Sequence, residues 1–297
     1  STPPTACGGK VVLRALDKAN LSIGLDTLGF SADTLMRFKE AIAKPFGMIL
    51  VTGPTGSGKS TTLYSVINQM NTPDKNIITI EDPVEYQVEG ITQIQAKAEI
   101  GLTFANGLRS LLRQSPDIIL VGEIRDFETA EIAVKAALTG HLVLSTLHTN
   151  DAPSSISRLL NMGIEPFLIN SSFLLAASQV LLRLLCPECK ESYNMLPTIY
   201  YQLEQYGYKR DSIPPVIYRA KGCSKCNQTG YRGRSAVMEV LLLSAKIKEL
   251  IEANVSEKEI RTQAKREGMR TLRENALELL IKGLTSLEEI ARITSSV

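Results

Sequence analysis

The sequence contains no tryptophan and only two histidines, and aromatic residues make up only 5% of its 297 residues. It also lacks a strong charge of either sign, because its formal net charge is +2. Nucleic-acid-binding proteins usually show a basic excess, or aromatic side chains on which bases stack. The composition therefore gives no support for a nucleic-acid partner, and we expect none.

Long apolar runs are also lacking. No stretch reaches the roughly 18 uninterrupted apolar residues of a membrane span, and the nearest, residues 173–185, is interrupted by Ser178, Gln179 and Arg183. Residues 1–10 do not show the charged and then apolar order of a signal peptide. We therefore expect a cytoplasmic protein that reaches a membrane only by docking on a partner.

Short apolar runs alternate with amphipathic segments between residues 28 and 182. Four runs rich in Ile, Val and Leu occupy residues 48–51, 77–80, 118–121 and 142–145. Helical patterns over residues 60–70 and 128–138 lie between them. Buried parallel strands have such continuous apolar sequences. The alternation predicts a parallel α/β sheet with helices on both faces.

The rest of the chain divides into three further segments. Residues 1–27 contain one predicted strand, residues 10–16, and we expect them to be the end of a preceding domain together with a linker. Residues 183–234 hold four of the cysteines and most of the tyrosines, and we expect a small separate module. Residues 235–297 form the fourth segment, for which we predict a helical subdomain.

Helical patterns in that last segment cover residues 247–253, 257–267, 271–282 and 287–293. Ser256 with Glu259, and Ser286 with Glu289, have the spacing of a capping box, in which two side chains satisfy the free N–H groups of a helix start. The two pairs predict where the second and fourth of these helices begin.

A glycine-rich loop between an apolar run and a helical pattern is the strongest motif. It consists of Gly53, Pro54, Thr55, Gly56, Ser57, Gly58, Lys59, Ser60 and Thr61. It matches the G-x-x-x-x-G-K-[ST] pattern, in which backbone N–H groups cradle phosphate oxygens and the following helix directs its positive end at the same anion. Lys59 is expected to neutralise the β and γ phosphates, and Ser60 to ligate Mg²⁺. A glycine-rich turn that binds nothing is the alternative.

Carboxylates follow two of the predicted strands. Glu123 comes after Gly122, which stands where many phosphate-loop enzymes have an aspartate, and Glu123 is our candidate to activate the attacking water. Glu81, Asp82 and Glu85 follow residues 77–80, at the carboxyl edge of the sheet, where ligands bind in α/β folds. We assign Glu81 and Asp82 to Mg²⁺, and group Glu85 with Glu123 and Lys59 as catalytic. A solvated acidic loop is the alternative.

Both histidines flank a single apolar run. His148, at its C-terminal end, is expected to sense the γ-phosphate by hydrogen bonding. His141, at the opposite end, is expected to have a structural or interface part, because a lone histidine usually satisfies a hydrogen bond in the core.

Four of the five cysteines form two C-x-x-C pairs, Cys186 with Cys189 and Cys223 with Cys226, and Cys7 stands alone. Two such pairs supply four thiolates, the ligand set of a closed tetrahedral Zn²⁺ site. We predict that zinc holds residues 186–230 together and has no catalytic part. A redox role, or four ordinary cysteines, are the alternatives.

Four segments, in this order, resemble the motifs of the secretion ATPase superfamily, above all the assembly ATPases of type II secretion systems and type IV pili. Residues 53–64 (GPTGSGKSTTLY) resemble the Walker A motif of that family, and residues 80–86 (IEDPVEY) resemble its aspartate box. Residues 116–126 (PDIILVGEIRD) resemble its Walker B motif, and residues 139–152 (TGHLVLSTLHTNDA) its histidine box. The tetracysteine element, absent from the related retraction ATPases, extends the resemblance over nearly the whole chain.

The resemblance implies a RecA-like P-loop core with a small tetracysteine zinc module and a C-terminal helical subdomain. It implies ATP hydrolysis with Mg²⁺, in a motor that powers type II secretion or pilus assembly. It also implies a hexameric ring at the cytoplasmic face of the inner membrane, bound to a membrane platform protein and a cytoplasmic docking protein.

Arginines of the family carry a further implication. Those of its N-terminal domain reach the nucleotide, and Arg14 matches one such position. Arg109, Arg113 and Arg125 match family arginines near the nucleotide or the subunit interface, although a surface salt bridge is the alternative for each of them. An arginine finger is worth about 10³ to 10⁵ in rate, so we expect a fragment without the preceding domain to hydrolyse ATP slowly.

Two other functions are compatible with the phosphate loop. A RecA-like nucleic-acid motor, such as a helicase or recombinase, shares the loop and the ring, and single-stranded DNA would stimulate its hydrolysis. A nucleotide-gated scaffold binds ATP but hydrolyses little. Substitution of Glu123 by Gln separates an enzyme from a scaffold.

Overall fold

The computed structural model describes residues 4–6, 8–9, 11 and 24–294. Arg14 and Cys7 lie outside the described residues, as does the strand predicted over residues 10–16 apart from Val11. Near the N-terminus, β1 (Pro4–Thr5) and β2 (Gly8–Gly9) form a short antiparallel pair.

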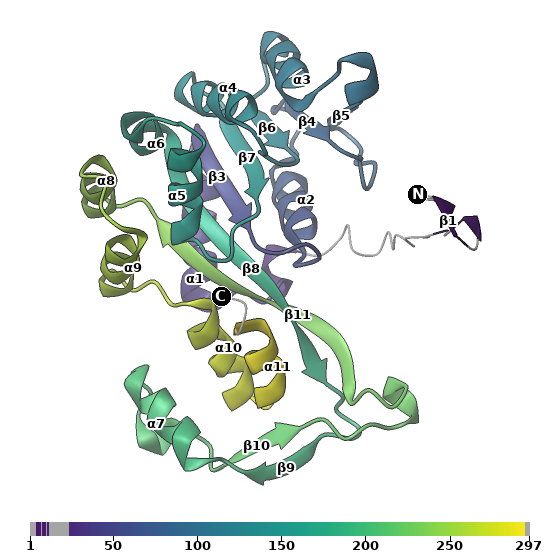
Figure 1. Ribbon diagram of the computed structural model, residues 1–297, viewed down its shortest axis with the longest axis vertical. Helices are drawn as coiled ribbons and strands as arrows, with labels where there is room; N and C mark the ends of the chain where they lie inside the picture. The colour runs from purple at the N-terminus through teal and green to yellow at the C-terminus, as the bar shows by residue number, and fades with distance from the viewer. Residues whose placement is uncertain (1–3, 7, 10, 12–23, 295–297) are drawn as a thin grey trace.

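One seven-stranded sheet organises the described chain, in the order β11-β8-β3-β7-β6-β4-β5 (Figure 1). Its strands are β3 (Gly47–Thr52), β4 (Ile77–Glu81), β5 (Thr92–Gln95), β6 (Ile118–Val121), β7 (Leu142–Leu147), β8 (Phe173–Leu185) and β11 (Tyr231–Leu242). Neighbours are parallel except β8 and β11, which pair antiparallel. The four apolar runs predicted as parallel strands are β3, β4, β6 and β7, and every residue in these four strands is buried.

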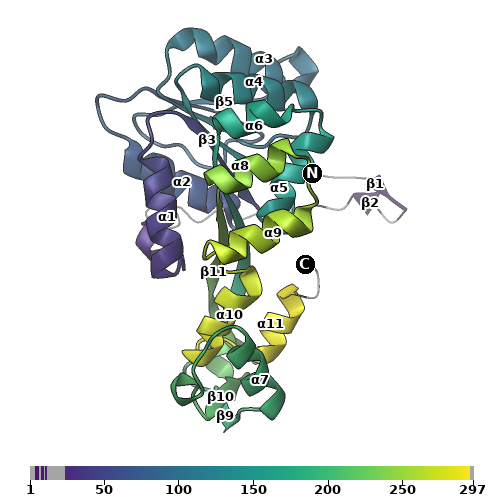
Figure 2. The same ribbon diagram turned by 90° about the vertical axis from the view of Figure 1, so that its left-hand side faces the viewer.

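Helices cover both faces of this sheet, as predicted. On one face lie α1 (Ala32–Ile42) and α2 (Lys59–Met70); on the other lie α3 (Phe104–Leu111), α4 (Phe127–Leu138), α5 (Pro153–Asn161) and α6 (Pro166–Ser172) (Figure 2). Alternate residues of β3 point to opposite faces of the sheet. Met48 and Leu50 pack in the core on one face, and Ile49 and Val51 pack in the core on the other. The sheet is therefore the middle layer of three.

The antiparallel pair β8 and β11 extends out of the sheet as a two-stranded ribbon and leads to a small outlying module (Figure 1). The module contains β9 (Glu191–Asn194), α7 (Pro197–Gln205) and β10 (Val216–Arg219), with β9 and β10 paired antiparallel. The expected domain boundaries at residues 182 and 234 both fall inside the ribbon. Core and module thus share two continuous strands.

The C-terminal segment contains four helices at the predicted places: α8 (Ala245–Glu252), α9 (Glu257–Arg266), α10 (Leu272–Ile281) and α11 (Leu287–Thr294). The prediction of helical structure directly from residue 235 was wrong, because residues 235–242 complete β11. Residues 236–241 of that strand are all buried. Their sequence therefore lacks the alternation of apolar and polar residues that marks a strand with one face in solvent. The described part of the chain also contains short 3-10 helices, at Leu25–Thr27, Ala98–Ile100, Leu112–Gln114, Arg210–Ser212 and Ser224–Cys226.

The two predicted capping boxes differ in outcome. Ser256 and Glu259 form both reciprocal bonds at the start of α9, as predicted. At α11 the Ser286 hydroxyl accepts from the Glu289 N–H at 3.3 Å, but the Glu289 carboxylate accepts from Arg183 and Arg292 instead. A third box, Thr271 with Glu274, begins α10. Among the described residues, no helix has the length and apolar character needed to cross a membrane.

Candidate nucleotide-binding site

The phosphate loop lies at the carboxyl end of β3 and leads directly into α2. Gly53, Gly56 and Gly58 adopt φ values of 134°, 80° and 88°, a region that favours glycine. These turns bring the start of α2 against the loop, so that the partial positive charge of the helix end faces the same space as the loop. The loop has the backbone conformation that a phosphate cradle requires.

Lys59 is the first residue of α2, and its side chain folds back over the loop. Its Nζ donates to the carbonyl oxygens of Gly53 at 2.8 Å and Pro54 at 3.1 Å. Burial lowers the pKa of Lys59, and the nearby negative charge of Glu123 opposes this effect. A phosphate group bound in front of the loop would supply a further anion to this buried ammonium group.

A cavity of about 490 Å³ opens in front of the loop and is lined by side chains that the sequence predicted for the nucleotide site. Its lining includes Lys59, Ser60, Asp82, Glu85, Glu123 and His148. These residues come from the carboxyl ends of β3, β4, β6 and β7, which are neighbours in the sheet. Sequence segments up to about 90 residues apart therefore meet in one cavity, as the rule for α/β folds predicts.

Glu123 is the central carboxylate of this cavity. Its Oε1 lies 2.5 Å from Nη2 of Arg125, and its Oε2 lies 3.5 Å from Nε2 of His148. The preceding Gly122 packs tightly, since an added Cβ would lie 3.3 Å from both the Cα of Glu81 and the carbonyl oxygen of Ile80. A side chain at position 122 would therefore require β4 to shift by a few tenths of an ångström, and glycine avoids this crowding.

The acids after β4 are arranged differently from one another. Glu81 is buried, and its two oxygens accept from Tyr64 at 2.6 Å, Thr79 at 2.7 Å and Gln93 at 3.3 Å. Burial and this contact with Glu81 raise the pKa of Tyr64. Asp82 is exposed and Glu85 is half-buried in the wall of the cavity. Of the two acids assigned to Mg²⁺, Asp82 is the one with a carboxylate open to a ligand.

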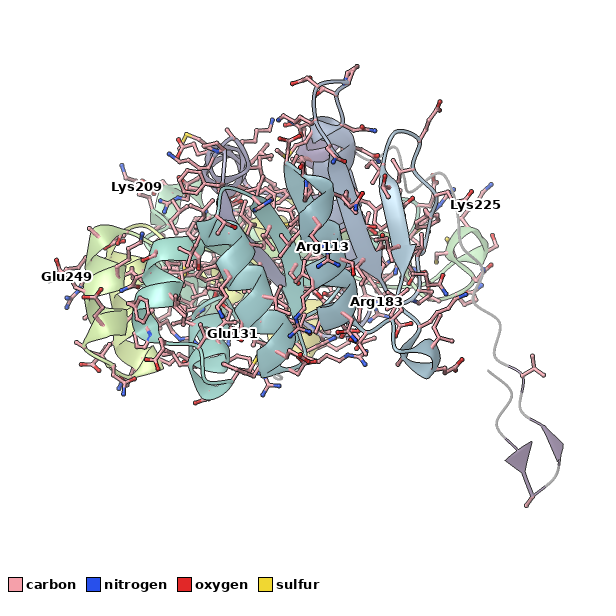
Figure 3. The ribbon with its side chains drawn as sticks, turned by 90° about the horizontal axis from the view of Figure 1, so that it is seen from above. Arg113, Glu131, Arg183, Lys209, Lys225 and Glu249 are labelled. Atoms are coloured by element: carbon pink, nitrogen blue, oxygen red, sulfur yellow. The ribbon has the colours of Figure 1, made fainter. Side chains whose placement is uncertain are left out.

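Two of the predicted arginines lie away from the cavity. Arg109 pairs with Glu128 at 2.6 Å, and Arg113 donates to the carbonyl oxygen of Arg109 at 3.1 Å. Both are exposed on the helical layer that contains α3, where Figure 3 shows Arg113. Of the three predicted arginines that the structure describes, Arg125 is the one with an ion pair to a residue of the cavity, Glu123.

His141 lies at the opposite end of β7 from His148. Its Nδ1 is 2.9 Å from the carbonyl oxygen of Ala136 and 3.3 Å from Oγ1 of Thr139, at the end of α4. These contacts join the end of α4 to the start of β7, in line with the structural part expected for His141.

The cavity also contains residues that the sequence did not indicate. Thr146 donates to the Gly122 carbonyl at 2.7 Å and fixes the turn before Glu123. Leu181 of β8 and Arg234 of β11 enter from the ribbon, and Phe104 enters from α3. The strand order β11-β8-β3 brings Leu181 and Arg234 there, and no local sequence pattern reveals that order.

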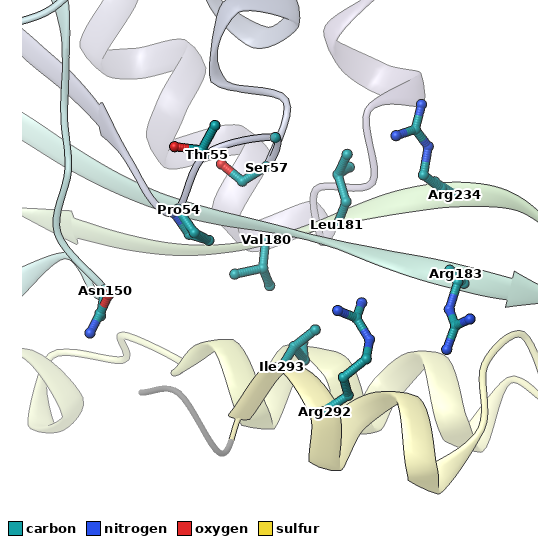
Figure 4. Close-up of a pocket in the computed structure, with 11 residues that line it drawn as sticks. Pro54, Thr55, Ser57, Asn150, Val180, Leu181, Arg183, Arg234, Arg292 and Ile293 are labelled. Carbon is teal, nitrogen blue, oxygen red and sulfur yellow. The ribbon is translucent and has the colours of Figure 1, made fainter. Parts of the chain in front are cut away.

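A second cavity, of about 410 Å³, lies on the other side of the phosphate loop, between the loop and α11 (Figure 4). Val180, Leu181 and Ile293 give it apolar walls, and Arg183, Arg234 and Arg292 reach it from three elements. Glu289 is buried between Arg183 and Arg292, and although its burial alone would raise its pKa, these arginines hold that pKa down at about 2.

The four cysteines of the two C-x-x-C pairs meet at the tip of the ribbon. Their sulfur atoms all lie within 4.8 Å of one another. The Cys186–Cys223 Sγ distance is 4.0 Å, and the Cys189–Cys226 and Cys223–Cys226 distances are 3.8 Å. A tetrahedral Zn²⁺ with Zn–S bonds of about 2.3 Å places its sulfurs about 3.8 Å apart. The cluster therefore has the spacing of a closed zinc site.

Backbone donors favour a thiolate at this cluster. Sγ of Cys226 accepts from the N–H groups of Cys223 and Gly230, both at 3.2 Å. Burial alone would raise the pKa of Cys226, but these donors, together with the side chains of Cys223 and Cys189, lower it to about 6. A deprotonated sulfur is what a metal ligand requires.

A phosphate loop, a carboxylate and a histidine at the carboxyl edge of a mainly parallel sheet together define a RecA-like P-loop protein. Within that class, the chain belongs to the type II/IV secretion system protein family, whose model matches residues 1–292. This confirms the fold class and the family indicated by the sequence motifs.

Curated relatives agree with this assignment. The chain is 53% identical over 296 residues to the type IV pilus assembly ATPase PilB of Myxococcus xanthus, covering 99% of this chain and 52% of that protein. It is 48% identical over 294 residues to the type II secretion system ATPase E of Vibrio cholerae, covering 99% of this chain and 58% of that protein. The chain thus spans just over half the length of these relatives.

Solved structures with the same fold include the pilus retraction motor PilT with bound ADP, at a TM-score of 0.68 and 29% identity, covering 94% of this chain and 68% of PilT. The ATPase DotB of Legionella pneumophila matches with a TM-score of 0.65 and 25% identity, covering 93% of this chain and 66% of DotB.

Proposed function

We propose that this chain is the ATP-hydrolysing part of a motor that drives type II secretion or type IV pilus assembly. The single observation that carries the proposal is the convergence of Lys59, Glu123 and His148 on the cavity in front of the phosphate loop. Lys59 and the loop amides would hold the phosphates. Glu123 would orient and activate the attacking water, and His148 would contact the γ-phosphate.

The acids of the cavity would hold Mg²⁺ together with Ser60. Ser60 and Asp82 are exposed, and they line the same cavity as Lys59. Oxygen ligands of this kind suit Mg²⁺, which when bound neutralises charge on the β and γ phosphates. Glu81 would act mainly through Tyr64, whose hydroxyl donates a hydrogen bond of 2.6 Å to the Glu81 carboxylate. Glu85, half-buried beside Asp82, would support Glu123 as a second catalytic carboxylate.

A homo-oligomeric ring, and a hexamer in particular, is the assembly that we propose from the relatives named above. Arg109 and Arg113 lie outside the cavity on an exposed helical layer, a position from which they would reach a neighbouring subunit rather than their own nucleotide. Arg14 would contact the nucleotide from the preceding domain. The ring would lie at the cytoplasmic face of the inner membrane, bound to a platform protein and a cytoplasmic docking protein.

Zinc would have a structural part at the tip of the ribbon. The module rests on one small core that it shares with the ribbon, α10 and α11, to which it contributes Ile199, Leu203 and Ile217. A metal that ties β8 to β11 at the tip would stabilise this outlying part. The four sulfur ligands would leave no open position for catalysis.

Hydrolysis assays on Glu123→Gln test the proposed activity. The variant should bind Mg-ATP with the affinity of the unchanged chain and lose hydrolysis by about 100-fold or more, the usual worth of a positioned base. Glu131→Gln is a matched control, because Glu131 is an acid of α4 that pairs with Lys135 and does not line the cavity. Failure of the unchanged chain to bind Mg-nucleotide would overturn the proposal. Equal hydrolysis by Glu123→Gln would remove Glu123 from its role, and stimulation by single-stranded DNA would favour a nucleic-acid motor.

A further inference from the structure

Gln179 is a fully buried polar residue of β8, with 1% of its surface exposed. It follows Ser178, which is the register partner of Thr52, the last residue of β3. Gln179 therefore lies beside the point at which β3 ends and the phosphate loop begins. A buried amide requires partners at both ends, because an unsatisfied polar group costs free energy.

The two ends of this amide form hydrogen bonds to the phosphate loop and to the helix that follows it. Nε2 of Gln179 donates to the carbonyl oxygen of Ser57 at 2.8 Å. Its Oε1 accepts from the hydroxyl of Thr62 at 2.7 Å. One side chain thus links the loop to the first turn of α2, from a strand that is remote in sequence.

The bond to Ser57 determines the direction of one loop peptide. The Ser57 C=O and the Gly58 N–H belong to the same planar trans peptide unit, in which the two groups point in opposite directions. Because the carbonyl points toward Gln179, the Gly58 N–H points away from it. Gly58 also lines the cavity that holds Lys59 and Glu123. The reversed peptide would direct a carbonyl oxygen, in place of an N–H donor, at the phosphate side.

Close packing adds a second link between Gln179 and the loop. A Cβ on Gly53 would lie 2.2 Å from the carbonyl oxygen of Gln179, and a Cβ on Gly58 would lie 2.8 Å from its Nε2. Contact with the Gln179 backbone therefore favours glycine at position 53 in addition to its positive φ angle, and a side chain at position 58 would push against the Gln179 amide that bonds to Ser57.

From these contacts we infer that Gln179 is a positioning residue, which sets the Ser57–Gly58 peptide for phosphate binding. This inference rests on the proposed nucleotide site and adds a residue to it. Gln179 touches no phosphate itself and acts through Ser57 and Thr62. It also lies on the strand that continues to Cys186, so the ribbon and the phosphate loop are joined at this residue.

Gln179→Glu is the direct test, because it keeps the shape of the side chain and replaces the donor to Ser57 with a second acceptor. We expect the Kd of the folded protein for Mg-ATP to rise about tenfold or more. Calorimetry well below the melting temperature measures this Kd. Ser178→Ala is the matched control. It removes a buried hydroxyl of the same strand, which donates to the Asn150 carbonyl at 3.1 Å, and should lower stability while keeping the Kd within about twofold.

Thr62 provides a second test that does not alter Gln179. Thr62→Val removes the donor to Oε1 and should also weaken Mg-ATP binding, whereas Thr62→Ser keeps the hydroxyl and should restore the original Kd. A merely structural role would lower the melting temperature of Thr62→Val and leave the Kd of the folded protein unchanged. If Gln179→Glu does not fold, equal Kd values for Thr62→Val and Thr62→Ser would overturn the inference.

The outcomes for this inference and for the nucleotide site are distinguishable. No binding of Mg-ATP by the unchanged chain would overturn the proposed function and this inference with it. Binding by the unchanged chain with the same Kd for Gln179→Glu would overturn the inference alone.

Discussion

Nη2 of Arg125 lies 2.5 Å from Oε1 of Glu123. The Arg125 side chain is 67% exposed and that of Glu123 is 14% exposed, so the cation covers the outer side of a largely buried acid. The hydrogen bond to Glu123 raises the pKa of Arg125, and the charges of Glu123 and Asp82 contribute in the same direction. Arg125 therefore holds in place the carboxylate to which we assign the attacking water.

Removal of Arg125 should affect hydrolysis more than binding. In Arg125→Ala, Glu123 would retain His148 at 3.5 Å but lose its closest partner, and its carboxylate would be less well oriented. We expect kcat for ATP to fall by about 10- to 100-fold, as for other misplaced catalytic groups. Arg125 does not line the cavity, so the Kd for Mg-ATP should change by less than about threefold. Steady-state hydrolysis and calorimetry measure the two effects.

Two variants serve as controls for this prediction. Arg125→Lys keeps the charge and should restore part of kcat. Lys135→Ala removes a cation of α4 that pairs with Glu131, and it should leave kcat unchanged. An unaltered kcat in Arg125→Ala would mean that Arg125 contacts Glu123 without supporting its role.

Loss of charge at Glu81 should mainly lower stability, whereas loss of charge at Asp82 should mainly weaken the response to Mg²⁺. Glu81→Gln places an amide donor among Tyr64, Thr79 and Gln93, which already donate to Glu81, and should lower the free energy of unfolding by about 1–3 kcal/mol. Asp82→Asn alters an exposed side chain and should cost less than about 0.5 kcal/mol. Asp82→Asn should instead raise the Mg²⁺ concentration needed for half-maximal hydrolysis.

Urea unfolding and Mg²⁺ titration of hydrolysis separate these two effects. The prediction fails if Glu81→Gln raises the Mg²⁺ requirement while the free energy of unfolding stays the same. In that case Glu81 would be the metal-associated acid, as we first expected from its position directly after residues 77–80.

The sequence predicts the central strands well because their surroundings are uniform. Strands β3, β4, β6 and β7 are buried on both faces, so continuous apolar runs reveal them. Strand β8 escaped prediction because Ser178 and Gln179 interrupt its apolar run. Both residues are nonetheless buried, since Gln179 bonds to Ser57 and Thr62, and Ser178 bonds to the Asn150 carbonyl. Partners this remote in sequence leave no local pattern.

The candidate site also combines residues that local sequence patterns predict with residues that only the fold brings in. The phosphate loop is contiguous in sequence, and Glu123 and His148 follow strands that periodicity reveals. Leu181 and Arg234 reach the cavity because β8 lies next to β3 and β11 lies next to β8 in the sheet. The cluster of four cysteines could be predicted because two C-x-x-C pairs specify it, although the ribbon that brings the pairs together could not.

Removal of the metal should loosen the module and spare the nucleotide site. Chelation of zinc, or Cys223→Ser, would leave the tip of the ribbon without its cross-link between β8 and β11, because the Cys186–Cys223 and Cys189–Cys226 contacts join the two strands. We expect faster hydrogen exchange over residues 186–230 and unchanged exchange in β3, β4, β6 and β7. The Kd for Mg-ATP should change by less than about threefold.

Hydrogen exchange followed by mass spectrometry measures the loosening, and addition of zinc to the chelated protein is its control. Exchange should return to the original rate after zinc is restored. If the Kd for Mg-ATP rises sharply on gentle removal of zinc, the module takes part in nucleotide binding and our assignment of a purely structural role is wrong.

Stability should depend on pH through Glu239, a carboxylate of β11 that is only 1% exposed. Burial raises the pKa of Glu239 to about 7, with a further contribution from Asp151, and the N–H donors of Ala152 and Leu272 and the charge of Arg261 only partly oppose the rise. The unfolded chain releases this proton near the ordinary glutamate pKa of 4.5, whereas the folded chain keeps it up to about pH 7. Folded protein therefore binds more protons between these values, so this group's contribution to stability is complete below pH 4.5 and is lost as the pH rises toward 7.

Glu239→Gln removes this titration and keeps the size of the side chain. The free energy of unfolding of the unchanged chain, minus that of the variant, should fall between pH 5 and pH 7, with a slope of at most about 1.4 kcal/mol per pH unit. Urea unfolding at intervals over this range gives the difference directly. Glu249→Gln, at an exposed acid of α8, is the matched control for the substitution itself. A difference for Glu239→Gln that rises with pH would show that Glu239 is charged in the folded protein, held by Arg261 and the two N–H groups against the cost of its burial.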